Sequence, residues 1–326
     1  MNVRRTIFRS LLAVGAMALA APVLAQTFPD KLVTIVVPFP PGGGIDVMVR
    51  ALAAELSTQW GKPVVIENKG GAGTLIGADA VARARPDGLT LLATIDQTVV
   101  SNRFLYKSLP YDPEKSFIPV TLMAEADHLL LAHPGVRANN LKELVALAKR
   151  QPGSLNFGSF GDGSQPVLVY GMLNKREGLD FVHVPYKGVA PMIAATVAGE
   201  VQLATGSPGV AGELLRGNRL KPLAIAGRRR AAQFPDVPTT AEQGFPYLRA
   251  SIWYGLFAPA GTPPAIINKL NADVTAVLKN RAFTEKQATS RGLQMVASSA
   301  EEFAARIRDD VVSTEEMVRA ANIKPQ

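Results

Sequence analysis

The feature that most restricts the fold is the stretch of residues 36–50, VVPFPPGGGIDVMVR, which joins an apolar segment to an amphipathic one through three consecutive glycines. The apolar segment, residues 32–38, is typical of a buried strand, and apolar residues at helical spacing follow in 46–60. A helix that begins at such a loop presents unpaired N–H groups at the positive end of its dipole. The stretch therefore predicts a strand, loop and helix that bind a carboxylate or phosphate through backbone amides.

The same strand and helix pattern recurs along the chain. A second glycine-rich turn, 70–73, precedes a helix predicted at 74–85 and a strand at 89–95, and a further α/β series begins at residue 156. Alternation of short apolar strands with helices is typical of parallel sheets covered on both faces. A chain of 326 residues also exceeds a typical single core. We therefore predict an α/β protein with two doubly wound domains around a ligand cleft.

The order of the predicted elements makes the first domain discontinuous. We expect residues 26–125 and 250–326 to form domain 1 and residues 126–249 to form an inserted domain 2, because the last helices are too few for a third domain. The chain would cross between the domains near 118–128 and 248–256, which would form a hinge. Ligands of open α/β sheets bind beyond the carboxyl ends of the strands, so the expected site is the cleft between the domains.

Residues 1–25 are typical of a signal peptide. Three arginines within the first nine residues precede an apolar run, 11–24, that ends in small residues. The run is shorter than the roughly 20 residues that a membrane span needs, and Pro22 interrupts it. The absence of cysteine excludes disulfides, a thiol nucleophile and a lipid-modified N-terminal cysteine. The sequence therefore predicts a soluble protein of the periplasm.

The charge of the chain indicates no nucleic-acid partner. The full sequence has 35 basic and 27 acidic residues, and removal of residues 1–25 takes three arginines and no acid, which leaves 32 against 27, or +5. This mild excess would favour small anions by steering. The triplet at 228–230 is the one basic cluster, and without an aromatic stripe it is interpreted as a solvated segment.

Two glycine-rich segments besides the first loop have spacings that resemble other kinds of binding site. Residues 71–77 have the spacing G-x-G-x-x-x-G, and the acid that a dinucleotide site needs is ambiguous between Asp87 and Asp96, so we expect no cofactor. Residues 158–164, GSFGDGS, precede a predicted helix, where Ser164 is equally suited to capping the helix and to donating to a ligand. Both segments are therefore interpreted as helix starts with exposed amides.

No catalytic apparatus is evident in the sequence. A G-x-S-x-G elbow and a P-loop lysine are both missing, so a secreted hydrolase would need a nucleophile that we do not find. His128, His133 and His183 lie in or beside predicted strands without metal-binding spacing, and we expect core or edge roles. Asp46 and Asp96 are a candidate carboxylate pair, although helix capping explains them equally well. We therefore expect no catalytic residue and no metal, and a receptor for a small carboxylate.

Ordered motifs then connect nearly all of the chain after residue 25 to a known family. They are PFPPGG at 38–43, EN at 67–68 with GAG at 71–73, PDG at 86–88, PYDP at 110–113, HVPYKG at 183–188, PDVPT at 235–239 and APAGTP at 258–263. With these motifs the chain resembles the Bug family, the periplasmic solute receptors of tripartite tricarboxylate transporters.

The resemblance implies a type II periplasmic-binding-protein fold that closes on a carboxylated metabolite. The implied partners are the small-molecule ligand and either the membrane subunits of a tripartite tricarboxylate-type transporter or a sensor protein in signalling. The receptor is expected to be a monomer.

The resemblance also implies where the ligand binds. Family members hold a carboxylate through the first loop, main-chain amides and ordered waters, which here assigns Phe39, Pro40, Gly42, Gly43, Gly44, Ile45 and Asp46. The same wall would include Gly73, Thr74 and Thr94. The opposite wall would include Ser159, Gly161, Gly163 and Ser164, with Lys187 as a candidate donor to a distal carboxylate or simply a solvated loop residue.

Three positions on that opposite wall depart from the family pattern. Ala195 stands where an aspartate is usual, Val167 where a histidine is common, and the segment that ends at Ser207 reads TGS instead of FDN. Loss of a carboxylate at Ala195 would disfavour an amino group on the ligand. We therefore hypothesise a simple or aromatic carboxylate as ligand, with specificity set around Ala195 and Ser207.

Overall fold

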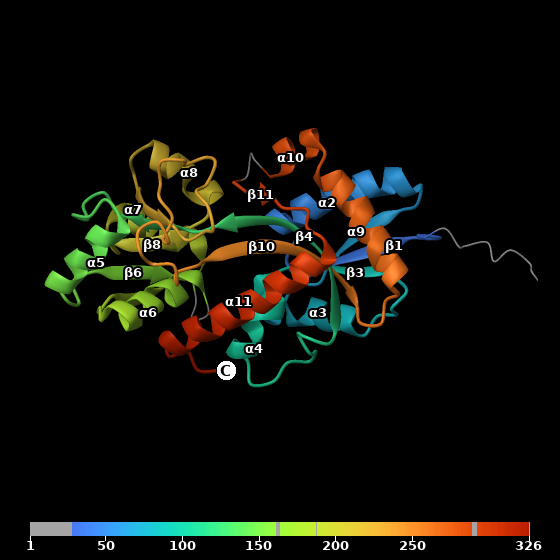
Figure 1. Cartoon of the computed structure of the whole chain (residues 1–326), viewed down its shortest axis with the longest axis horizontal. Coiled ribbons are helices and arrows are strands. Elements are labelled where there is room, and N and C mark those ends of the chain that lie inside the picture. The colour runs from blue at the N-terminus through green and yellow to red at the C-terminus, as the bar shows by residue number, and fades with distance from the viewer. Residues whose placement is uncertain (1–27, 161–163, 187, 289–291, 326) are drawn as a thin grey trace, which may run out of the picture. The chain divides into compact units, whose positions relative to one another are not determined.

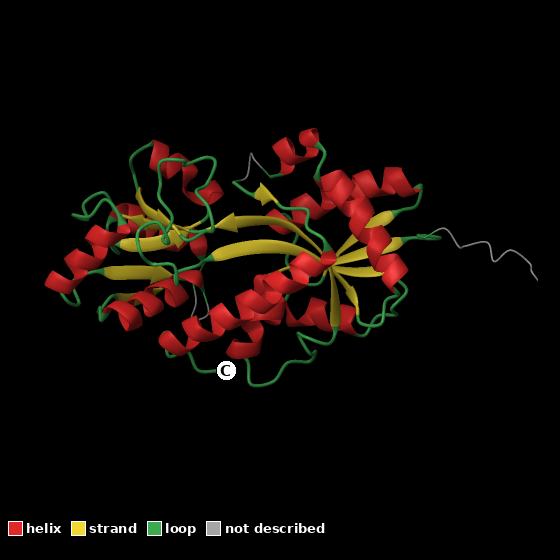
Figure 2. Cartoon of the chain, viewed as in Figure 1, coloured by secondary structure: helices red, strands yellow, loops and turns green. Residues whose placement is uncertain are grey.

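Two mixed β-sheets organise the chain, which a computed structural model describes at residues 28–160, 164–186, 188–288 and 292–325. Met1–Asp30 form a separate unit, and the account below concerns the unit Lys31–Gln326. Helices cover both sheets (Figure 2). Among the described residues, no helix combines the length and the apolar character needed to span a bilayer.

The first sheet has six strands in the order β11-β4-β10-β3-β1-β2. These are β1 (Val33–Val37), β2 (Val64–Asn68), β3 (Thr90–Ile95), β4 (Phe117–Asp127), β10 (Ser251–Pro259) and β11 (Gln294–Met295). β1 pairs in parallel with β2 and β3, whereas β10 runs antiparallel to both β3 and β4. β11 is also antiparallel to β4. Of these two reversed strands, β10 is the one on which the chain returns from the second sheet.

The second sheet has five strands in the order β7-β6-β8-β5-β9. These are β5 (Leu129–Ala132), β6 (Asn156–Ser159), β7 (Val182–Pro185), β8 (Leu203–Gly206) and β9 (Lys221–Ile225). β6 pairs in parallel with β7 and β8, and β5 is antiparallel to β8 and β9. Here too the exception, β5, is the strand that arrives directly from the other sheet.

The helices lie in the connections between strands, except for the last, which follows β11 (Figure 1). They are α2 (Gly44–Trp60), α3 (Leu75–Ala82), α4 (Asn102–Leu105), α5 (Leu141–Arg150), α6 (Gln165–Glu177), α7 (Val189–Ala198), α8 (Pro208–Arg216), α9 (Pro264–Leu278), α10 (Arg281–Gln287) and α11 (Ala300–Ala320). Two short turns, η1 (Ala72–Thr74) and η2 (Gln97–Ser101), precede α3 and α4. The strand and helix alternation expected from the sequence is therefore present in both sheets.

The unit β1–α2 shows how the sequence places the first glycine loop. All five residues of β1, VTIVV, are β-branched, which favours a strand, and four of the five are buried. Met48, Leu52 and Leu56 recur at helical spacing in α2 and are fully buried. The helix ends at Gly61, which adopts the left-handed conformation that suits glycine. The start of α2 is thereby fixed at the carboxyl edge of the sheet.

Two paired strands carry the chain between the sheets. β4 leads through His128 directly into β5, and β10 returns antiparallel to β4 with Ser251 opposite Asp127. The strands of the first sheet come from residues 33–127 and 251–295, and those of the second from 129–225. The crossing segments coincide with those expected from the sequence, while the exact domain boundaries remain a prediction.

Helix α11 contacts both sheets. Ser299 and Glu302 form a reciprocal capping box at its start. Phe303, near this end, packs with Trp253 of the first sheet, whereas Met317 and Val318 belong to the hydrophobic core of the second. Figure 1 shows α11 running from one sheet toward α6 of the other. α11 is therefore a third connection between the sheets, in addition to β4 and β10.

Candidate functional site

The candidate site is a cavity of about 1000 Å³ between the two sheets. Its walls are formed where strands of both sheets end: Ile95 ends β3, Thr205 and Gly206 end β8, and Phe160 follows β6. Ligands of open α/β sheets bind at this edge. The cavity therefore lies at the edge where the sequence predicts the site, and the binding site itself stays a prediction.

The first wall contains the start of α2. Gly44, the first residue of the helix, lines the cavity together with Tyr254 of β10. A Cβ atom at Gly44 would lie 2.6 Å from the Tyr254 hydroxyl oxygen, so glycine leaves room for that hydroxyl. The residue before the helix, Gly43, makes no side-chain cap. The positive end of the α2 dipole and a phenol therefore lie side by side at the cavity.

Asp46 stabilises the first loop from within. Its carboxylate accepts hydrogen bonds from the Gly42 amide at 2.8 Å, Asn68 Nδ2 at 2.8 Å and Arg50 Nε at 3.0 Å. Burial raises the pKa of this carboxyl group, and these donors more than offset the effect, so that the pKa lies below its usual value. Asp46 is 2% exposed. Its partners come from the loop, from α2 and from the end of β2, and Asp46 does not pair with Asp96.

Thr74 and Thr94 form a buried network under the second glycine turn. Thr94 and Thr98 hydroxyls are 2.5 Å apart, and Thr98 donates to Thr74 Oγ1 at 2.9 Å. Asn102 Nδ2 donates to the Gly73 carbonyl at 2.9 Å. Thr74 has a positive φ of 82°, a conformation that costs a non-glycine residue about 1–3 kcal/mol. The network therefore holds a strained turn in place.

Gly73 brings that turn close to the cavity. A side chain at this position would overlap the hydroxyl group of Tyr106, which lines the cavity. The two threonines thus act behind the wall, and Tyr106 is the residue in front of it.

Ser164 and Ser207 line the wall of the second sheet. Each immediately precedes a helix, α6 and α8, in extended backbone conformation. His128 also lines the cavity, and its Nδ1 lies within hydrogen-bond distance of Thr205 Oγ1, at 3.2 Å. Burial lowers the pKa of His128 to about 4, so this imidazole is neutral at physiological pH. The wall therefore offers neutral polar groups from three elements.

Ser159 lies behind the second wall. The residue is fully buried, and its hydroxyl is 2.5 Å from Nε2 of His183, whose ring stacks on Phe157. His183 lines the cavity, whereas Ser159 does not. A nucleophile must reach its substrate, so this serine and histidine are better suited to supporting the wall than to catalysis.

The remaining sequence-predicted residues have the following positions. Phe39, Pro40, Gly42, Gly43 and Ile45 belong to the loop and first turn before or within α2, beside the cavity-lining Gly44. Ala195 is buried in α7, 5% exposed. Gly161, Gly163 and Lys187 lie outside the described residues.

Several lining residues were not predicted from the sequence as ligand contacts. They are Asp96, Gln97, Tyr106, His128, Gln165, His183, Thr205 and Tyr254. Half of them directly follow a strand or begin a helix, namely Asp96, Gln97, His128 and Gln165, and this is the signal that could have found these four. Gln97 begins η2, a π-type turn, and such turns are frequent at functional sites.

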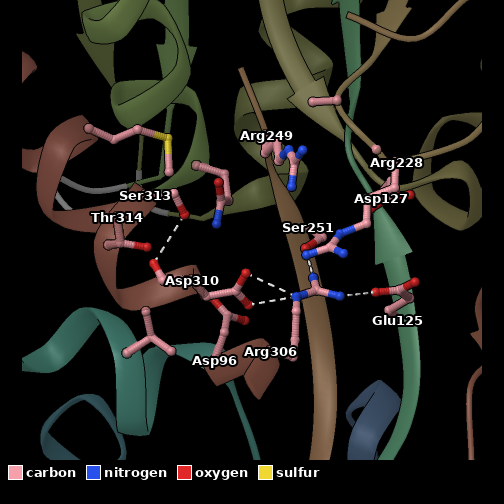
Figure 3. A pocket seen from close by; sticks show the side chains of 15 residues that line it. Asp96, Glu125, Asp127, Arg228, Arg249, Ser251, Arg306, Asp310, Ser313 and Thr314 are labelled. Atoms are coloured by element: carbon pink, nitrogen blue, oxygen red, sulfur yellow. Dashed lines mark hydrogen bonds and ion pairs between the residues drawn. The ribbon is translucent and has the colours of Figure 1, made fainter. Parts of the chain in front are cut away.

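A smaller cavity of about 40 Å³ adjoins the site and is lined by a charged cluster. Arg306 of α11 donates to Glu125 of β4 at 2.7 Å, to Ser251 of β10 at 2.8 Å and to Asp310 at 2.9 Å (Figure 3). Asp310 also accepts from Trp253 Nε1 at 2.8 Å. Arg306 thus ties together the three elements that connect the sheets.

Asp127 is a further carboxyl group of this cluster. Burial and the neighbouring Glu125 raise its pKa to about 7. Gly227 must lack a side chain, because a Cβ atom there would overlap the Asp127 carboxylate. Among the described residues, no group of three or more His, Asp or Glu side chains could hold a metal ion.

Comparison with known proteins identifies the family. The model of the tripartite tricarboxylate transporter family receptor matches residues 48–323. Protein BugT of Bordetella pertussis is 34% identical over 325 residues, which are 99% of each chain.

Solved structures give the same result. An R. palustris protein determined with adipate is 30% identical with a TM-score of 0.76, covering 92% of this chain and 100% of the other. MatC from Rhodopseudomonas palustris, with bound malate, is 34% identical with a TM-score of 0.71, covering 89% and 100%. The expected two-domain α/β fold of periplasmic solute-binding proteins is confirmed. The chain therefore belongs to the receptors of the tripartite tricarboxylate transporter family, the Bug proteins, which are solute-binding receptors and not an enzyme family.

Proposed function

We propose that this protein is exported by a signal peptide in residues 1–25 and acts in the periplasm as a monomeric receptor for a small carboxylate. It delivers this ligand to the membrane subunits of a tripartite tricarboxylate-type transporter, and it neither uses a cofactor nor catalyses a reaction. The observation that carries the proposal is the start of α2 at Gly44, which opens into the cavity between the sheets.

A carboxylate suits this position for electrostatic reasons. A negative charge near a helix N-terminus gains about 0.3–1 kcal/mol at exposed sites and up to about 2 kcal/mol in partly buried ones. Gly44 and Tyr254 line the cavity together, so a bound carboxylate can face both the helix dipole and a phenol. The bound adipate and malate of the two R. palustris relatives support the same ligand class.

The rest of the cavity favours an apolar body on the ligand. Apolar side chains from β10, from α4, α6 and α7, and from the residue after β6 line it, including Leu105, Phe160, Val167, Val189 and Ile252. An amino-acid ligand would also need a partner for its ammonium group, and the aspartate that the family usually has at the position of Ala195 is absent here. We therefore propose a simple or aromatic carboxylate as ligand.

Thermal shift and calorimetry on residues 26–326 test this function. The ligand panel contains adipate, malate and benzoate, the amino acids aspartate and glutamate, and the neutral amides adipamide and benzamide as controls. A carboxylate at 100 times its Kd stabilises the fold by about 2.7 kcal/mol. We expect at least one of the three amino-free carboxylates to do so, and the amides to have no effect.

Each other result contradicts a defined part of the proposal. Equal stabilisation by the neutral amides would contradict recognition of the negative charge of the ligand at the start of α2. Strongest stabilisation by aspartate or glutamate would contradict the ligand class, and no effect of any carboxylate would contradict the receptor function itself.

A further inference from the structure

We propose that Asp96 faces the bound ligand as a protonated acid, so that capture of a carboxylate is coupled to uptake of a proton at this residue. The inference rests on the proposed function and adds to it a residue and a pH dependence. Neither the family resemblance nor the glycine loops assign any such role to Asp96.

Asp96 lies where the two cavities meet. It follows β3 directly and precedes the π-type turn η2. It lines both the large cavity and the smaller charged one, and it is half-buried. Figure 3 shows it next to Asp310, on the side of Arg306 away from Glu125. The position places a carboxyl group beside the space that an anionic ligand would occupy.

The neighbouring charges do not neutralise this carboxyl group. Charged and titratable side chains line the two cavities on several elements. They are Glu125 and Asp127 from β4, Arg306 and Asp310 from α11, His128 between β4 and β5, Arg228 after β9, Arg249 before β10, Lys324 after α11, Tyr106 after α4, His183 from β7 and Tyr254 from β10. Arg306 already forms short ion pairs with Glu125 and Asp310. Asp96 therefore shares its nearest cation with two other carboxylates.

Burial and the charge of Asp310 together raise the pKa of Asp96 to about 7. The backbone amides of Asp96 and Trp253 and the charge of Arg306 act in the opposite direction and offset the increase only in part. A group with this pKa exchanges its proton near neutral pH and can respond to a neighbouring anion.

The side chain of Gln165 gives an independent reason for a proton at the junction. Gln165 also lines both cavities, and its Oε1 is buried without a hydrogen-bond partner among the described residues. An ionised Asp96 would add only hydrogen-bond acceptors beside this unpartnered oxygen. A protonated Asp96 has an O–H group, which can donate to a ligand oxygen at the junction.

Linkage gives the size and the sign of the effect. Asp96 is mostly protonated below its pKa of about 7 and mostly ionised above it. If the bound state requires the proton, the apparent affinity falls roughly tenfold between about pH 6 and about pH 8. At about pH 7, binding takes up about half a proton per ligand.

Calorimetry with adipate, malate and benzoate tests the coupling. Binding is measured at about pH 6 and about pH 8, in two buffers of different ionisation enthalpy, so that proton uptake is counted directly. Wild-type protein is expected to lose affinity roughly tenfold over this range. Asp96→Asn keeps a donor and cannot ionise, so its affinity should not share this loss and should exceed that of wild type roughly tenfold at about pH 8.

Asp127→Asn is the matched control. Asp127 has a similarly raised pKa, but among the two cavities it lines only the smaller one. This variant is expected to keep the wild-type pH profile. The Asp96 carboxyl carbon, followed by NMR in wild-type protein, should titrate near pH 7 without ligand and at higher pH with adipate.

The possible failures are distinguishable. The same pH dependence in wild type and Asp96→Asn, no proton uptake, or an ordinary Asp96 titration would overturn this inference and leave the proposed function standing. Absence of saturable binding by all three probes at both pH values would overturn the proposed function, and this inference with it.

Discussion

Replacement of Arg306 by alanine is expected to destabilise the fold strongly. The Arg306 side chain is 14% exposed, and its partners Glu125 and Asp310 are 16% and 23% exposed. The change leaves two largely buried carboxylates without their cation and removes the hydrogen bond to Ser251. Loss of one partner from a buried ion pair costs about 3–5 kcal/mol, because the remaining charge stays desolvated.

The penalty should depend on pH in a defined direction. Burial raises the pKa of Asp310, and the loss of Arg306 removes the nearby positive charge that now lowers it. Carboxyl groups left without their cation take up protons as the pH falls, which removes the uncompensated charge. The destabilisation of Arg306→Ala should therefore be largest at about pH 8 and shrink toward about pH 5.

Urea unfolding followed by circular dichroism measures this change. For a domain of this size, a loss of about 3–5 kcal/mol lowers Tm by roughly 6–15 °C. The control is Arg83→Ala, since Arg83 is 71% exposed and forms an i,i+4 pair with Asp79 that contributes about 0.3–0.5 kcal/mol. A loss below about 1 kcal/mol, or equal losses in the two variants, would refute the reasoning.

Two further predictions concern the cavity walls. Gly44→Ala should weaken carboxylate binding at least tenfold by calorimetry, because the new methyl group displaces the Tyr254 hydroxyl from the start of α2. Gly212→Ala is the control, since a Cβ atom at position 212 meets only Arg216, at ordinary contact distance. Equal affinities of the two variants would contradict the role of Gly44. His128 should stay neutral down to about pH 4 when its imidazole is followed by NMR, because burial lowers its pKa. Titration of this imidazole near the ordinary pKa of 6.5 would contradict the prediction and show that the cavity wall is hydrated at His128.

Much of the fold could be predicted from the sequence because its local signals agree. The β-branched run at 33–37, the glycine loop and the helical spacing of Met48, Leu52 and Leu56 all indicate the same unit. The directions of β5 and β10 could not be predicted from local pattern, since they depend on how the chain crosses between two sheets. The contact of α11 with both cores is a tertiary property of the same kind.

The site was predicted less completely than the fold. Glycine loops are visible in a sequence, and the loop at Gly44 lies at the cavity. Single residues such as Asp96 and Tyr254 have no motif, because their importance comes from the space they face and the charges nearby. Thr74 and Thr94 show the converse, since residues at a helix start and a strand end can support a wall from behind.

The position of α11 has a consequence for the order in which the chain acquires its structure. Phe303 completes one hydrophobic core, and Met317 and Val318 complete the other, yet all three follow every strand of both sheets in the chain. Domains generally fold from the N-terminus during synthesis, but here neither core has its full set of side chains when the last strand, β11, has been made. A nascent chain of this protein therefore stays incompletely packed on both sheets until α11 has also been made.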